Sequence, residues 1–201
     1  GVRWFSESVS HIPKKETFEI TKINRYERPI IKHRWGQHSK DSDGLLNLRN
    51  KLSTFGERLG PKYSYNHAYG DFACHTIGAL IPDDLFLEHP EYFPEVNGKR
   101  INTPTGPLSK KEHHQRCLTN PDVLKLVIEQ VKESFRENPY QFIFSVSQAD
   151  TYPLEPNNCQ CEQCRSIDEK EGSPMGSLLN FVNKVAEAIE VEFPGKYIDT
   201  L

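Results

Sequence analysis

The sequence lacks the marks of several common classes of protein. Lys and Arg number 25 against 28 Asp and Glu, which leaves a formal net charge of -3. Proteins that bind nucleic acid or anionic membranes normally carry a basic surplus, so this charge argues against both kinds of partner. No apolar run approaches the ~20 residues that a membrane helix needs, and no internal repeat, low-complexity tract or signal peptide is visible.

Apolar residues are also few. They make up 36% of the chain and are accompanied by 14 prolines and 12 glycines, so loops must be plentiful around the core. Aromatic residues at 10% fit a loop-rich globular enzyme better than a disordered chain. Residue 1 is Gly and the chain stops inside the strand-like run 197–201, so we expect this sequence to be a piece of a longer protein. The absence of a targeting segment from it therefore says nothing about the compartment of the protein.

Residues 115–201 carry the clearest fold signal. Asn120-Pro121-Asp122 supplies a helix cap, a proline at the first helical position and an acid in the first turn. The order strand, helix, strand, helix, strand predicts an α/β fold with a parallel sheet and right-handed crossovers. The predicted elements are a strand at 115–118, a helix from 121 to 138 that buries Leu124, Ile128, Val131 and Phe135, a strand at 142–147, a helix from 173 to 193 and a strand at 197–201.

The first half of the chain shows shorter elements. We interpret residues 1–28 as the tail of a preceding domain, with a short edge strand around Phe18 and Ile20, and residues 29–201 as the domain that follows. A strand at 30–35, a helix at 45–52 and a peripheral hairpin with its turn at Asn97-Gly98 are predicted. Long connections rich in Pro, Gly and aromatic residues fill the rest of 36–115, and loops of such length are usually functional.

The cysteines give the sharpest chemical signal. Cys159, Cys161 and Cys164 form a C-x-C-x2-C run, which brings three soft thiolates close together and suits a tetrahedral metal such as zinc. Cys117 is the best candidate for the fourth ligand, because strand order places it at the same sheet edge as the cysteine-rich loop 151–172. Four thiolates leave no open position for water, so the predicted zinc is structural, and no organic cofactor is expected.

Other interpretations of the cysteines stay open. Cys74 or His75 is an alternative fourth ligand, with His113 and His114 further substitutes. Disulfides are a second possibility in a secreted protein, although cysteines as close as Cys159 and Cys161 bridge each other only with strain. Free buried thiols are the third.

The expected ligand face lies beyond the carboxyl ends of the strands, where α/β enzymes gather their chemistry. Asp150 is the first carboxylate after the strand 142–147, so it is the candidate catalytic residue; a loop Asp that caps the backbone or pairs with Arg is the alternative. His33, Arg34 and Trp35 end an earlier candidate strand, and His75 sits among aromatic residues. These four are candidates for binding a polar ring substrate, and a structural role is the alternative for each.

Several short motifs are spread over nearly the whole chain. They are Gly1-Val2-Arg3-Trp4-Phe5, Ile12-Pro13, His75-Thr76, His89-Pro90-Glu91-Tyr92-Phe93, Asn97-Gly98-Lys99-Arg100, Gln115-Arg116-Cys117-Leu118-Thr119-Asn120-Pro121 and the cysteine run. Together they resemble the uncharacterised bacterial domain of unknown function 4838.

This resemblance implies a carbohydrate-active protein, more distantly similar to α-glucuronidases and β-hexosaminidases. It implies a small α/β domain followed by a (β/α)8 TIM-type barrel. Residues 1–28 would belong to the small domain, and 29–201 would form the N-terminal part of the barrel. The resemblance also implies a periplasmic or extracellular location.

The stretch from Cys117 to the cysteine run also resembles family 42 β-galactosidases, in which one cysteine and a later C-x-C-x2-C run hold a structural zinc. Those enzymes carry an Asn-Glu pair at the end of the strand before the cysteine run, whereas this chain reads Ser147-Gln148-Ala149-Asp150 there. Asp150 therefore corresponds to the acid/base Glu by position only. The partner carboxylate is expected beyond Leu201.

Two functions from different classes follow as hypotheses. The first is a glycoside hydrolase acting on oligo- or polysaccharides by general acid/base catalysis, with Asp150 as general acid. The second is a non-catalytic carbohydrate-binding barrel that keeps the zinc site. A zinc module for protein or nucleic-acid contact is disfavoured by the charge of -3.

Overall fold

The computed structural model describes residues 2–6, 8–17, 19, 22–24, 26, 30–31, 34, 45–52, 74–102, 115–149 and 158–200. The chain divides into two compact units, Gly1–Ala68 and Tyr69–Leu201. Our sequence interpretation divided the chain after residue 28, and that domain assignment stays a prediction. None of the described helices is both long enough and apolar enough to span a membrane.

The first unit contains a small antiparallel pair and one short helix. Strand β1 (Arg3–Trp4) pairs with β2 (Ser10–His11), and helix α1 (Leu45–Arg49) lies within the predicted helix. The Arg49 guanidinium stacks 3.9 Å from the centre of a Trp4 ring. In the predicted strand 30–35, the described residues 30, 31 and 34 adopt no strand, and Phe18 and Ile20 lie outside the described residues.

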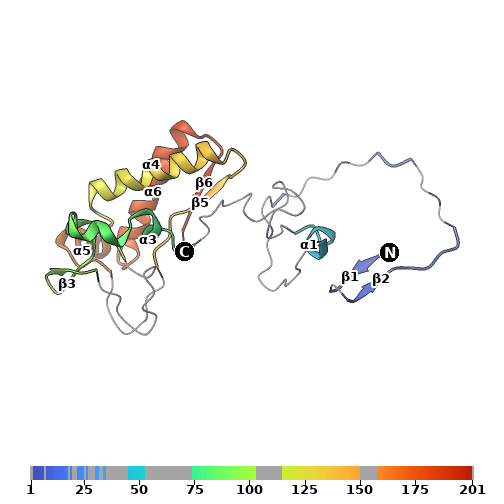
Figure 1. Cartoon of the computed structure of the whole chain (residues 1–201), viewed down its shortest axis with the longest axis horizontal. Coiled ribbons are helices and arrows are strands. Elements are labelled where there is room, and N and C mark those ends of the chain that lie inside the picture. Colours follow the sequence, from blue (N-terminus) through green and yellow to red (C-terminus); the bar gives the residue numbers. More distant parts are fainter. Residues whose placement is uncertain are drawn as a thin grey trace. The chain divides into compact units, whose positions relative to one another are not determined.

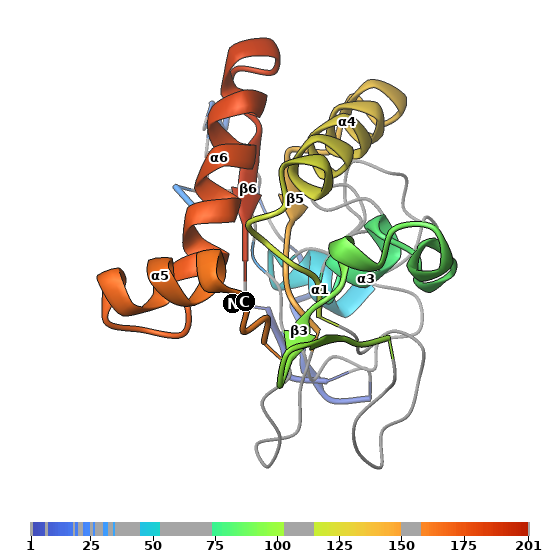
Figure 2. The same ribbon diagram turned by 90° about the vertical axis from the view of Figure 1, so that its left-hand side faces the viewer.

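The second unit is a mixed α and β structure built on two parallel strands. Strand β5 (Ile143–Ser145) pairs with β6 (Tyr197–Asp199) in parallel, with Phe144 opposite Ile198. Helices α4 (Pro121–Glu137), α5 (Glu162–Glu171) and α6 (Gly176–Glu192) accompany them. Figure 1 gives their order, and Figure 2 shows α4 beside β5 and α6 beside β6. The predicted parallel pairing is confirmed.

The predicted strand at 115–118 is wrong. These residues, all described, form no strand, because the Cys117 amide donates to the Tyr92 carbonyl (2.8 Å) and the Arg116 side chain binds the Ile81 carbonyl. The backbone here is therefore tied to the segment before it rather than to β5. That segment holds helix α3 (Ile77–Leu80) and the 3₁₀ helices η2 (Asp83–Leu87) and η3 (Pro90–Tyr92), which the sequence interpretation took for loops.

Helix α4 begins as its sequence predicts. The Asn120 side chain accepts hydrogen bonds from the amides of Asp122 (2.8 Å) and Val123 (3.2 Å), and Pro121 occupies the first turn. The predicted burial of Val131 and Phe135 is confirmed, whereas Leu124 and Ile128 are only partly buried and flank the core. The fully buried α4 side chains that form the core are Val123, Val127, Val131 and Phe135.

The core lies between the helices and one face of the strands. Phe144 and Val146 of the β5 segment pack there against Leu178, Val182, Val185 and Ile189 of α6. Since side chains alternate along a strand, Ser145 and Ser147 lie on the opposite face, where the Ser145 hydroxyl donates to that of Ser147 (3.2 Å). The two faces of this segment therefore differ in polarity.

Two connections in the second unit have ordered structure of their own. Strands β3 (Glu95–Val96) and β4 (Lys99–Arg100) form the predicted hairpin, and Asn97 and Gly98 have φ of 50° and 74°, as a type I′ turn requires. The predicted loop 151–172 is wrong over 162–171, which is α5. This helix ends at Gly172 (φ 65°), whose left-handed conformation lets the Ser173 amide return to the Asp168 carbonyl.

Candidate metal centre

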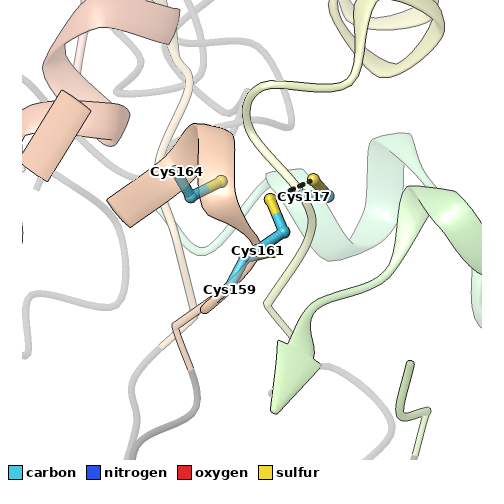
Figure 3. A group of neighbouring side chains, drawn as sticks. All are labelled: Cys117, Cys159, Cys161 and Cys164. Atoms are coloured by element: carbon cyan, nitrogen blue, oxygen red, sulfur yellow. Dashed lines mark hydrogen bonds between the residues drawn. The ribbon is translucent and has the colours of Figure 1, made fainter. Parts of the chain in front are cut away.

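Four buried cysteines meet in the second unit. The Sγ atoms of Cys117, Cys159, Cys161 and Cys164 all lie within 4.8 Å of one another, and those of Cys117 and Cys161 are 3.8 Å apart (Figure 3). Zinc with four Zn–S bonds of about 2.3 Å places its sulfurs about 3.8 Å apart. The cluster therefore has the donor set and the size of a tetrahedral thiolate site.

Three segments bring the sulfurs together. Cys117 lies in the turn before α4, where its backbone amide donates a hydrogen bond to the Tyr92 carbonyl. Cys159 and Cys161 come from the loop before α5, with Cys161 as the residue that caps the helix, and Cys164 lies in the first turn of α5. The N-terminus of a helix favours negative charge, so it stabilises the thiolate forms that bind a metal.

Polar groups surround the sulfurs. The Glu95 amide donates to Cys159 Sγ (3.4 Å), and an Arg100 Nη atom donates to the same sulfur (3.5 Å). The Thr119 hydroxyl lies 3.2 Å from Cys164 Sγ and 3.6 Å from Cys117 Sγ. Such outer contacts orient metal ligands and adjust their basicity.

Hydrogen bonds among the thiols lower the pKa of one of them and raise the pKa of two others. Hydrogen bonds with Cys159 and then Cys164 hold the pKa of Cys117 far below its ordinary value. The bond with Cys117 is the main cause that raises the pKa of Cys159 to about 11, and bonds with Cys117 and Cys159 raise the pKa of Cys164 well above its ordinary value. The coupling therefore favours the thiolate at Cys117 over Cys159 and Cys164, and metal binding, which requires thiolates, would release protons from the cluster.

This geometry bears on the two questions that the sequence left open: whether the cysteines form disulfides, and which residue is the fourth ligand. All five cysteines are free thiols, so the structure contains none of the disulfides considered from the sequence. Cys74 is exposed and outside the cluster, and the Nδ1 atom of His75 is hydrogen bonded to the Gln148 carbonyl (3.0 Å). Cys117, rather than either of these, completes the set of four; His113 and His114 lie outside the described residues.

The structure does not test the other predicted site residues as a group. Asp150, His33 and Trp35 lie outside the described residues. Arg34 belongs to the first unit, where its guanidinium donates to the carbonyls of Lys51 (2.7 Å) and Ile31 (2.8 Å). Their roles in binding or catalysis stay predictions.

His75 is tied closely to the β5 segment. It has a φ of 53°, a left-handed conformation unusual outside glycine, and its ring contacts Gln148, two residues before Asp150. The adjacent Thr76 hydroxyl donates to the Ser145 carbonyl (2.5 Å) and accepts from the Ser147 amide (3.1 Å). These bonds hold residues 75 and 76 alongside the carboxyl end of β5.

A small pocket adjoins the cysteines. Its lining includes Gln115, Gln148, Asn158, Cys159 and Cys164. The enclosed space is about 10 Å³, enough for about one water molecule.

Sequence reasoning missed the residues that surround the sulfurs. Thr119 is two positions from Cys117 and could have been found from that proximity. Arg100 and Glu95 are 59 and 64 positions from Cys159, and no spacing rule connects them. The hairpin was expected to be peripheral, whereas its residues contact the cluster.

Comparison with known proteins identifies a family. The model of a domain of unknown function, DUF4838, matches residues 4–201. No curated protein and no solved structure matches the chain.

Proposed function

We propose that this chain, which belongs to the DUF4838 family, is the zinc-stabilised N-terminal part of a glycoside-hydrolase-like (β/α)8 barrel. The observation that carries the metal part of the proposal is the cluster of four buried sulfurs, all within 4.8 Å of one another. Zinc is the preferred ion because it has no redox chemistry and favours tetrahedral thiolate sites. With four protein ligands its role is structural.

The barrel part of the proposal is supported by the parallel pair β5–β6 with α4 and α6 packed against it. Repetition of this strand and helix order would close a barrel whose helices lie outside and whose polar strand face, with Ser145 and Ser147, lies inside. The carboxyl end of β5 then opens toward the ligand face. Gln148, which follows β5, lines the same small pocket as Cys159 and Cys164. A bound zinc would therefore fix the chain close to the segment that contains Asp150.

The chemistry proposed for this face is glycoside hydrolysis of oligo- or polysaccharides. Asp150 would protonate the leaving oxygen as general acid, and a second carboxylate would activate water or attack the anomeric carbon. His75, which the Gln148 carbonyl holds near this segment, would bind a sugar hydroxyl. Glucuronides and hexosaminides are the first substrates to test.

The metal is tested by its content in the purified protein. We expect about one equivalent of zinc in the wild type and in Cys74→Ser, whose thiol is exposed, and a large loss of zinc in Cys117→Ser. Less than roughly a tenth of an equivalent in the wild type would overturn the metal proposal.

The activity is tested with the natural full-length protein and a panel of aryl glycosides. Asp150→Asn should lower turnover by about 10²-fold or more, while Asp84→Asn, a change at an exposed position of η2, should leave it unchanged. Wild-type turnover in Asp150→Asn would remove Asp150 from the mechanism. Oligosaccharide binding without turnover of any substrate would favour the carbohydrate-binding alternative.

A further inference from the structure

We propose that Arg100 is the charge-compensating residue of the metal centre and that it makes the β3–β4 hairpin part of that centre. The inference rests on the proposed zinc site and adds a residue to it that the sequence does not indicate. Arg100 is a positioning residue here, because it would act on the metal through Cys159.

The contacts of Arg100 are specific. One Nη atom donates to Cys159 Sγ (3.5 Å) and to the Phe93 carbonyl (2.7 Å), while Nε lies 3.6 Å from a carboxylate oxygen of Glu95. The side chain is 26% exposed, so the guanidinium is only partly hydrated. Both of its anchors, Phe93 and Glu95, hold the charge against the sulfur.

The charge of the centre makes such a residue necessary. Four thiolates and one dication leave a net charge of about -2 on a buried group. Burying uncompensated charge is unfavourable, so donors to the sulfurs stabilise the loaded state. The Glu95 amide and the Thr119 hydroxyl contribute partial positive charges. Arg100 contributes a formal positive charge, which the Glu95 carboxylate 3.6 Å away offsets only in part.

Further hydrogen bonds connect the hairpin to the cysteine loop. The Gln160 amide donates to the Glu95 carbonyl (2.7 Å), and the Asn97 amide donates to the Gln160 side chain (3.0 Å). Gln160 lies between two of the proposed ligands. Hairpin and ligand loop therefore share one network, in which Arg100 reaches the sulfur itself.

The test compares three variants of the whole chain. Arg100→Gln removes both the positive charge and the guanidinium group, whereas Arg100→Lys keeps the charge. The control, Lys99→Gln, removes a charge from the neighbouring, exposed position of the same strand. Zinc affinity is measured by competition with a chromophoric chelator. Cobalt(II) substitution reports the thiolate-to-metal absorption, and circular dichroism at saturating zinc checks that each variant folds.

We expect Arg100→Gln to weaken zinc binding by about 10- to 100-fold and to shift the cobalt absorption, while Lys99→Gln stays within about 3-fold of the wild type. Arg100→Lys should recover part of the loss. Wild-type affinity and spectrum in folded Arg100→Gln would overturn the inference, as would a Lys variant no better than the Gln variant. A wild type that binds no zinc would overturn the metal proposal itself, so the two failures are distinct.

Discussion

Arg116 is the largest of the fully buried side chains in the described part of the chain. Its guanidinium donates to the Ile81 carbonyl from Nε (2.8 Å) and Nη2 (2.5 Å), pairs with Asp83 (2.8 Å) and stacks 4.4 Å from the centre of the Phe93 ring. Burial lowers the pKa of this group, and Asp83 opposes that effect. One charged side chain therefore connects α3, η2 and the turn that carries Cys117.

Replacing Arg116 by Met should destabilise the protein by about 3 kcal/mol, because buried carbonyls and the Asp83 carboxylate would lose their partner. Arg136 is the matched control: it pairs with Glu133 and Glu192 at the surface, so Arg136→Met should destabilise the protein much less than Arg116→Met. Urea unfolding at saturating zinc measures both. Equal losses in the two variants would contradict the role of burial.

At the scale of elements, α4 and α6 are joined by charge as well as by their apolar faces. Glu192 near the end of α6 accepts from Arg136 (2.6 Å) and pairs with Lys132 (3.1 Å), both on α4. The hydrogen bond from Arg136, followed by that from Lys132, lowers the pKa of Glu192. These exposed pairs fasten the ends of the two helices that cover the sheet.

The ion pairs of Glu192 with Arg136 and Lys132 predict a specific pH dependence of stability. Because the folded pKa of Glu192 is depressed, its stabilisation is fully present above the unfolded value of about 4.3 and is lost as pH falls through the lower folded value. Glu192→Gln should therefore unfold at lower urea than the wild type at neutral pH, and the difference should vanish in acid. Glu190→Gln, exposed on the same helix, should match the wild type throughout. A difference for Glu192→Gln that persists at about pH 2 would contradict this assignment.

At the scale of the whole molecule, the proposed metal belongs to one unit only. The four cysteines of the cluster lie in Tyr69–Leu201 and bring the turn before α4 next to the loop before α5. The β3–β4 hairpin is connected to the cluster by hydrogen bonds, such as that from the Glu95 amide to Cys159 Sγ. The apolar core between α4, α6 and β5 does not include the sulfurs. A metal bound at the cluster and the apolar core would therefore stabilise different parts of the same unit.

Removing the metal should loosen those parts selectively. After chelation, amide hydrogen exchange should rise by about 10-fold or more at 95–100 and 158–165, because metal binding energy is folding energy there. The amides of α4 should change less, since its buried side chains pack in the apolar core, and α1 in the first unit should not change. Uniform acceleration across the chain would show instead that the unit depends on the metal as a whole.

The sequence by itself determined the local features of this protein. The Asn120 cap, the hairpin turn at Asn97-Gly98, the parallel order of β5 and β6 and the closely spaced Cys159, Cys161 and Cys164 follow from short-range chemistry or from strand order. The prediction of Cys117 rests on a strand at 115–118 that the structure does not contain, and its hydrogen bond to the Tyr92 carbonyl holds it in the cluster instead. Helix α5 could have been included, because helix-forming residues precede Gly172 at its end. The family assignment also rests on motifs in the sequence.

Only the tertiary structure decided how distant segments meet. Residues 115–118 could have formed a strand, but the Tyr92 carbonyl and the anchors of Arg116 hold them in a different conformation. Val123 and Val127 of α4 are buried in place of the expected Leu124 and Ile128, because packing against α6 and β5 decides which side chains face the core. Arg100 reaches Cys159 across 59 positions for the same reason: a hydrogen bond depends on distance in space, which sequence separation does not encode.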